Sequence, residues 1–229
     1  MISLIHTPTP NLSQSLAFYQ KLEFNVLSHE HPLLVSDGKA IIEINPDRYA
    51  RAGVKVLSDD PSELVMRLRE VWHVEEFDKE CLLDDPSGVR VYLPKSYPDF
   101  QLPEPQDSFS KLGNFAGLSL ETSNMEQSAA IWKLLGFDKV SGSPDKGWVS
   151  LTNAHGLTIS LMKPNACPHL FFNPSMTYFN GSRNMDIIEG VRSLGIDIAE
   201  EITVFNDSGI VDNIIIRDPG GYGFFLFND

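Results

Sequence analysis

The chain has 229 residues, and 42% of them are hydrophobic, which is enough for one large core or two of ordinary size. Thirty-one acidic and eighteen basic residues give a net charge of −13, so nucleic-acid phosphates and anionic lipid surfaces would be repelled over most of the surface. The two cysteines are too few for a disulfide framework, and neither belongs to a Cys/His cluster with zinc spacing. No apolar run approaches membrane-spanning length, and the N-terminus lacks a signal-peptide pattern. We therefore expect a cytoplasmic protein with no nucleic-acid or membrane partner.

The first part of the chain predicts one strand, one helix and three more strands. A β-like run over residues 2–5 is followed by a turn and by Asn11, a favourable N-cap residue. Apolar residues then recur at helical spacing from Leu12 to Leu22. Three β-like segments follow around residues 26–27, 33–35 and 40–44, with a hairpin turn at Asp37-Gly38. The unit is βαβββ.

The same order of elements starts again near residue 54. A strand over residues 54–57 precedes a helix with Pro61 at its first position, and further strands are expected around residues 74, 82 and 89–93. Prolines and polar residues between positions 96 and 108 then predict a linker, because proline interrupts both helix and sheet. We therefore place a first domain at residues 1–96, a Pro-rich linker at residues 97–109 and a second domain at residues 110–229.

The second domain repeats the plan of the first. Its helix, capped by Asn124, runs through residues 128–137, which match residues 15–24 in kind and order. Near the end of each half an Asp-Pro turn, beginning at Asp85 or Asp218, precedes a terminal strand. The second half is longer between these two motifs, and we expect much of the excess in a loop over residues 164–174. Within that loop, Cys167-Pro168-His169 carries donor atoms but no paired ligands in sequence, so a plain loop is predicted.

A capped helix containing Ser-Leu-Ala-Phe-Tyr, followed by Asp-Pro-Ser-Gly before a terminal strand, resembles the vicinal-oxygen-chelate superfamily. This superfamily includes glyoxalases, bleomycin-resistance proteins and extradiol dioxygenases. The resemblance covers nearly the whole chain apart from the linker. It implies an α+β fold of four βαβββ modules in two domains, in which each pair of modules curls its strands around a cup-shaped cavity. In many members that cavity holds a divalent metal ion that chelates neighbouring oxygens of the substrate.

In the second domain the resemblance places non-ligating residues at the metal positions. Metal-using relatives carry His or Glu on the cavity side of the first and last strands of each module, because such an ion needs three or four convergent donors. The register of the helix motif puts Gly117 at the usual first-strand position and the next ligand near Met176, while Phe225 replaces the terminal Glu. None of these three residues is a ligand for such an ion.

The first domain departs less completely from the metal-binding pattern. His6 lies on the first strand and Glu43 on the fourth, but Gly53 or Lys55 replaces the next His and Tyr92 replaces the final Glu. Two donors are half a site, and a lysine on the same face would repel the ion. We therefore predict no cofactor, with a divalent metal around His6 and Glu43 as the alternative. The plainer interpretations are a hydrogen-bonded structural His6 and a solvent-facing Glu43.

Three functions remain open at this stage. The first, which we rank highest, is a glyoxalase-like or bleomycin-resistance-like protein that binds a small molecule without the metal triad. The second is a metal-dependent lyase, isomerase or extradiol-type dioxygenase with acid or base groups such as His6, Glu43 or Tyr178. The third is a degenerate structural or protein-interaction module. The tandem is compatible with a monomer or a homodimer.

The candidate binding residues fall in both domains, and we expect the ligand in the second because that domain has the longer loops. Phe225 is either a stacking group or a core residue. The first-domain candidates are His6, Glu43, Lys55 and Tyr92, and the second-domain candidates are Ser119, Glu121, Trp148, Ser160, Tyr178, Asn180 and Phe225.

Overall fold

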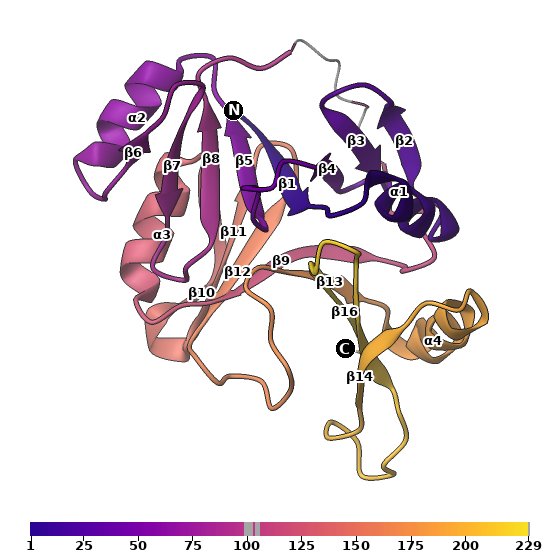
Figure 1. Ribbon diagram of the computed structural model, residues 1–229. Coiled ribbons are helices and arrows are strands. Elements are labelled where there is room, and N and C mark those ends of the chain that lie inside the picture. Colours follow the sequence, from indigo (N-terminus) through magenta and orange to yellow (C-terminus); the bar gives the residue numbers. More distant parts are fainter. Residues whose placement is uncertain (99–102, 104–105, 229) are drawn as a thin grey trace.

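The computed structural model of the protein describes residues 1–98, 103 and 106–228. Its strands form two eight-stranded sheets, one from each half of the chain, with the helices packed on them (Figure 1). The predicted α+β fold of four βαβββ modules is therefore confirmed. The proposed linker, residues 97–109, lies partly outside the described residues, so the domain boundaries remain a prediction.

The first half contains two modules in the expected order. Asn11 and Asp60 cap its two helices, each accepting a hydrogen bond from the backbone N–H three residues ahead. The elements are β1 (Ile2–Pro8), α1 (Leu12–Lys21), β2 (Asn25–Ser28), β3 (Leu33–Ser36), β4 (Ile41–Asn45), β5 (Gly53–Leu57), α2 (Pro61–Arg69), β6 (Glu75–Glu76), β7 (Glu80–Asp84) and β8 (Arg90–Pro94).

The second half repeats this order with longer connections. Residues 163–174 between its third and fourth βαβββ modules form a loop, but the expectation that they hold much of the excess length is wrong, because they number twelve against seven (46–52) in the first half. Residues 203–212 add more, with ten residues against three (77–79) in the first half. The elements are β9 (Phe115–Glu121), α3 (Met125–Leu134), β10 (Phe137–Ser143), β11 (Trp148–Asn153), β12 (Thr158–Met162), β13 (Ser175–Phe179), α4 (Asn184–Ser193), β14 (Ile198–Ile202), β15 (Asn213–Arg217) and β16 (Gly223–Phe227), with short 3-10 helices at Pro144–Lys146 and Gly181–Arg183.

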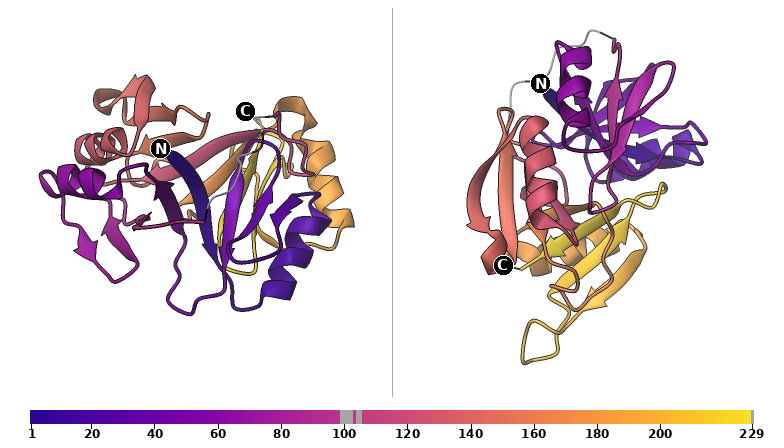
Figure 2. Two further views of the ribbon diagram at one scale, coloured as in Figure 1. Left: turned by 90° about the horizontal axis from the view of Figure 1, so that it is seen from above. Right: turned by 90° about the vertical axis from the view of Figure 1, so that its left-hand side faces the viewer.

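The first and last strands of every module lie at the centre of their sheet. The strand orders are β2-β3-β4-β1-β5-β8-β7-β6 and β10-β11-β12-β9-β13-β16-β15-β14. In each sheet the two modules join through antiparallel first strands, β1 with β5 and β9 with β13. The two views in Figure 2 show both sheets twisted and the two halves packed against each other. This topology brings the four positions from which metal ligands would be drawn onto adjacent strands.

One continuous hydrophobic core joins the two halves, and equivalent hydrogen bonds cross between them. The Tyr19 hydroxyl of α1 donates to Asp218 Oδ2 at 2.9 Å, and the Trp132 indole N–H of α3 donates to Asp85 Oδ2 at 2.9 Å. Both aspartates begin the Asp-Pro turn of the opposite half. The two motifs that reveal the repeat in the sequence therefore contact each other across the interface, where α3 lies beside α2 (Figure 1).

Among residues 1–98, 103 and 106–228, no helix combines the length and the apolar character needed to cross a membrane.

Candidate functional site

Each sheet has one face covered by helices and an opposite face, which we call the open face. Side chains alternate between the two faces along every strand. On the first sheet the open face carries His6, and on the second it carries Ser119.

The four first-domain candidates all lie on the open face of the first sheet. His6 on β1 is the register partner of Glu43 on β4, and Lys55 on β5 is the register partner of Tyr92 on β8. All four side chains are buried, and Glu43 is only 1% exposed. The sequence-based interpretation that Glu43 faces solvent is therefore wrong. His6 and Glu43 lie on one face, which the alternative of a metal site around them requires.

Glu43 is neutralised by a cation of its own domain. The Lys55 ammonium donates to Glu43 Oε1 at 2.6 Å, and the Tyr97 hydroxyl donates to Glu43 Oε2 at 3.0 Å. The ammonium also lies 5.4 Å from the centre of the Tyr97 ring. Tyr97 follows the last strand of the second module, and no sequence pattern predicts that it covers this pair. Both carboxylate oxygens are engaged within the protein.

His6 is a neutral structural residue. Its Nδ1 lies 2.9 Å from the carbonyl oxygen of Arg51 and must carry the proton, so its Nε2 accepts a hydrogen bond from the Asn45 amide at 3.0 Å. The Tyr92 ring packs against the imidazole, with the ring centres 4.2 Å apart. Burial, and then the charge of Lys55, lower the pKa of His6 to about 4. Both ring nitrogens are therefore occupied.

These residues do not fit a divalent metal ion. The imidazole has no free lone pair, the carboxylate is paired with Lys55, and an ammonium group lies where further donors are needed. A buried carboxylate that already has a cation at 2.6 Å gains little from a second one. The open face of the first sheet is therefore a closed polar network.

The open face of the second sheet is lined by hydroxyl groups on its third-module side. Three side-chain hydroxyl pairs lie across neighbouring strands: Ser119 with Thr177 at 2.7 Å, Ser150 with Ser160 at 3.0 Å, and Thr152 with Thr158 at 2.9 Å. Residues 150, 152, 158 and 160 are half-buried and thus partly open to solvent. Four of the predicted candidates lie on this face: Ser119, Glu121, Trp148 and Ser160.

Met176 and Tyr178 lie on the helix face, which corrects the expectation that they border the ligand site. Thr177, between these two residues, takes the open-face position, where its hydroxyl meets that of Ser119. Tyr178 is fully buried, and its hydroxyl donates to Asp37 Oδ2 of the first domain at 3.1 Å. The register was misplaced by one residue, which moves every side chain to the other face.

Asn180 and Gly117 have structural roles. The Asn180 amide donates to the carbonyl oxygen of Leu112 at 3.0 Å and to Asn184 Oδ1 at 2.9 Å, and Asn180 is buried at 6% exposure. Gly117 has a φ of +136°, and a Cβ there would lie 2.4 Å from the carbonyl oxygen of Thr158. The Asn180 amide is therefore occupied within the protein, and position 117 has no room for a side chain that could join Ser119 in binding a ligand.

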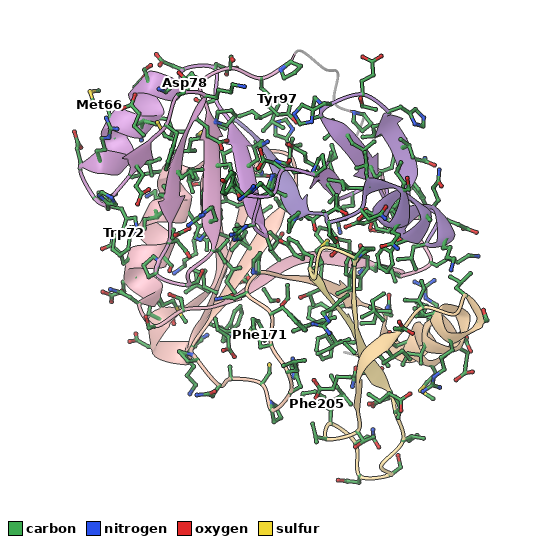
Figure 3. All side chains as sticks on the ribbon, in the orientation of Figure 1. Met66, Trp72, Asp78, Tyr97, Phe171 and Phe205 are labelled. Atoms are coloured by element: carbon green, nitrogen blue, oxygen red, sulfur yellow. The ribbon has the colours of Figure 1, made fainter. Side chains whose placement is uncertain are left out.

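The fourth-module side of the same open face is covered by phenylalanines. Phe225 on β16 packs with Phe171 and Phe172 of the 163–174 loop, around Ile202 and Ile215. Phe171 and Phe205 come from two separate loops that reach this side of the molecule (Figure 3). Phe225 is therefore a core residue of this cluster, which agrees with the plainer of its two sequence-based interpretations.

His169 is inserted into the phenylalanine cluster and was missed as a site residue. Its ring centre lies 5.1 Å from that of Phe225 and 5.5 Å from that of Phe227. Burial lowers the pKa of His169, and the charges of Glu200 and Glu121 partly oppose this effect. The sequence correctly predicted a loop at this position. The only available signal was that the loop is an insertion relative to the first domain.

Glu121 and His169 present buried polar atoms without partners. Across the described part of the chain, six buried side-chain N or O atoms have no hydrogen-bond partner, and three of these are Glu121 Oε1 and both ring nitrogens of His169. The remaining three belong to Ser3, Asn153 and Tyr222. Buried polar atoms are normally satisfied, so two such residues on one open face mark it as a candidate binding site.

The second sheet does not fit the usual metal triad either. The open-face residues on β9, β13 and β16 are Ser119, Thr177 and Phe225, and the two hydroxyls bind each other. Within the described ranges, no group of three or more His, Cys, Asp or Glu side chains is arranged to hold a metal ion. The available donors are hydroxyls, one carboxylate and one imidazole.

No protein-family model matches the chain, and no curated protein matches it. Solved structures do resemble it. The 2,3-dioxygenase LapB from Pseudomonas sp. KL28 superposes with a TM-score of 0.54 at 14% identity, covering 97% of this chain and 89% of that one. The Mn(II)-bound glyoxalase from Novosphingobium aromaticivorans gives a TM-score of 0.51 at 14% identity, with coverage of 97% and 79%. A variant of homoprotocatechuate 2,3-dioxygenase from B. fuscum gives 0.52 at 13%, with coverage of 99% and 70%.

At this level of identity the likeness concerns the fold. The chain has the glyoxalase and extradiol-dioxygenase fold, as its repeated motifs predict. Its activity has to be argued from its own site residues.

Proposed function

We propose that the protein binds a small molecule on the open face of its second sheet, without the usual metal ligands. The observation that carries the proposal is the pair of unpartnered side chains, Glu121 and His169, beside a half-exposed strip of hydroxyl groups. A buried polar group without a partner costs about 1 to 3 kcal/mol, and a ligand that satisfies it recovers part of that cost.

The first sheet is a weaker candidate for the same role. Its polar side chains already satisfy one another through the Lys55–Glu43 pair and the His6 hydrogen bonds. A ligand would have to break these contacts before making its own. On the second sheet, by contrast, hydroxyl groups are partly exposed and acceptor atoms have no partner, so a ligand would not have to break existing contacts.

The geometry favours capture of the ligand through hydrogen bonds and aromatic contacts. Hydroxyls both donate and accept, so the strip around Ser150 and Ser160 can orient polar groups of a ligand. Trp148 at the edge of this strip is 43% exposed, which leaves its indole available for stacking. Sites with few polar groups and aromatic walls are typical of small-molecule binding.

Tryptophan fluorescence tests the proposal, because Trp148 borders the proposed site while Trp132 is fully buried in the core. A library of small polar aromatic fragments should contain compounds that change the emission of the wild-type protein in a saturable way. The change should be lost in Trp148→Phe. A library without binders, or binders whose signal survives in Trp148→Phe and that leave NMR signals of the second sheet unmoved, would contradict the proposal.

A further inference from the structure

Three neighbouring strands place an aromatic ring, a thioether and a carboxylate in one row on the open face of the second sheet. Trp148 on β11 is the register partner of Met162 on β12, and Met162 is the register partner of Glu121 on β9. Adjacent strands are about 4.8 Å apart, so the backbone positions that carry the indole and the carboxylate are separated by roughly 10 Å. This row has the length of a small ring with one polar substituent.

The carboxylate at the end of the row lacks a counter-charge. Among the residues that the structure describes, Glu121 makes no ion pair, and its Oε1 atom is buried without a hydrogen-bond partner. Arg217, on the same open face, lies over the Phe172 ring at 5.4 Å. An unpaired carboxylate oxygen beside apolar side chains is unfavourable unless a cation or a strong donor meets it.

His169 offers a second acceptor beside this carboxylate. Because burial lowers its pKa, the imidazole is neutral at neutral pH, and a neutral imidazole has one nitrogen that accepts a hydrogen bond. The Glu121 charge is close enough to raise the pKa of His169 in part. Glu200, the other carboxylate near His169, is already bound to the backbone N–H of Leu170 at 2.7 Å. Glu121 and His169 therefore leave unused acceptor atoms on the same open face.

We infer that the ligand of this site is a small organic cation, a primary ammonium group on an apolar or aromatic body. The inference rests on the proposed function and specifies its ligand class. An ammonium group has three donors and no acceptor, so it satisfies Glu121 Oε1 and one His169 nitrogen together. Its apolar body lies over Met162 and reaches toward Trp148, whose half-exposed indole offers an aromatic surface. A neutral alcohol has a single donor, and an anion is repelled by Glu121.

Three probes with the same ring and different charge test the inference: benzylammonium, benzyl alcohol and benzoate. Calorimetry at neutral pH and low salt should show benzylammonium binding on the order of tenfold or more tightly than benzyl alcohol, with no measurable binding of benzoate. Glu121→Gln should reduce benzylammonium affinity on the order of tenfold and leave benzyl alcohol nearly unchanged. Glu126→Gln, an exposed α3 position with the same change of charge, is the matched control and should bind like wild type.

The outcomes separate the inference from the proposed function. Equal affinity for the ammonium and the alcohol, or benzylammonium affinity unchanged in Glu121→Gln, would overturn the cation assignment. Binding of the alcohol that perturbs Trp148 would at the same time support the proposed site. If none of the three probes binds, the cation assignment also fails, and the fragment library decides the proposed function independently. Trp148→Ala, which leaves Glu121 in place, provides a second variant and should also weaken benzylammonium binding.

Discussion

At the scale of single residues, the open face of the first sheet shows how a potential metal site becomes a structural network. Lys55 supplies the positive charge for Glu43 within the chain, and Tyr97 fills the second carboxylate oxygen. Pairs of this kind contribute little net stability relative to apolar replacements, but removal of one partner leaves an isolated buried charge. The network is therefore sensitive to single substitutions.

Replacement of Lys55 by methionine tests this account. Lys55→Met should lower the free energy of unfolding by about 3 to 5 kcal/mol, because Glu43 is 1% exposed and loses its counter-charge. The double variant Lys55→Met, Glu43→Met should recover most of the loss. Urea denaturation provides the measurement. Arg192→Met, which removes an exposed pair with Glu189 and Glu201, is the control and should have little effect. An equally small effect in Lys55→Met would contradict the account.

His6 should give a defined pH dependence of stability. Its pKa is lowered from 6.5 to about 4 in the folded protein, so between these pH values the unfolded chain binds more protons. The contribution is fully present above pH 6.5 and is lost as the pH falls toward 4, by about 3 kcal/mol in total. The difference in unfolding free energy between wild type and His6→Asn, measured from pH 7 to 4, should shrink by this amount. A difference that is constant with pH would mean that His6 is not held neutral.

At the scale of elements, the helix of each half is hydrogen-bonded to the Asp-Pro turn of the other half. We call this pair of contacts the clasp. Asp218 accepts hydrogen bonds from Thr7 at 2.6 Å and Tyr19 at 2.9 Å, both from the first domain. Asp85 accepts from Trp132 of the second domain. The similarity of the two halves in sequence therefore reflects equivalent contacts across one interface, in addition to equivalent folds.

The isosteric change Tyr19→Phe isolates one half of this clasp. It removes the hydroxyl donor from a buried carboxylate and should lower the free energy of unfolding by about 1.5 to 3 kcal/mol, the usual size for a hydrogen bond to a charged group. Chemical denaturation should still show one transition, because a single core joins the halves. Tyr49→Phe, at a position 70% exposed, is the control. Equal stability of the two variants would contradict the clasp.

The sequence predicted most elements of the fold because their signals are local. Capping residues such as Asn11 and Asn124, and Pro61 at a helix start, determine helix ends within a few residues. The repeat then supplied the module order. The face of β13 was mispredicted because its alternation was started one residue out of step, and a slip of one residue exchanges the two faces.

The candidate site was predictable only in part. Strand alternation predicts that Ser119 and Glu121 share one face, and the structure places Trp148 and Ser160 on that face as well. His169 was missed because a loop residue gains its role from contacts with Phe225 and Phe227, far away in sequence. Lys55 was expected to repel a metal ion, but its pairing with Glu43 was not expected. Contacts between residues far apart in the sequence cannot be predicted from the spacing of residues along one strand or helix.

At the scale of the whole molecule, the two halves share one fold but differ in the chemistry of their open faces. The first sheet encloses a satisfied polar network, and the second carries partly exposed hydroxyls with unused acceptors. Similar solved structures include dioxygenases and a Mn(II)-bound glyoxalase, but the residues at the corresponding open-face positions here lack the donors that such an ion requires. The central claim is a binding site that does not depend on metal.

Thermal melting in the presence of added Zn²⁺, Ni²⁺ or Fe²⁺ tests this claim most directly. A site that holds an ion in the folded state, at a hundredfold excess over its Kd, adds about 2.7 kcal/mol of stability. For a chain of this size that corresponds to a rise in Tm of roughly 5 to 10 °C. We predict no appreciable rise with any of the three ions. A saturable rise of this size that is lost in Glu43→Gln or Glu121→Gln would contradict the account and place a metal at the site.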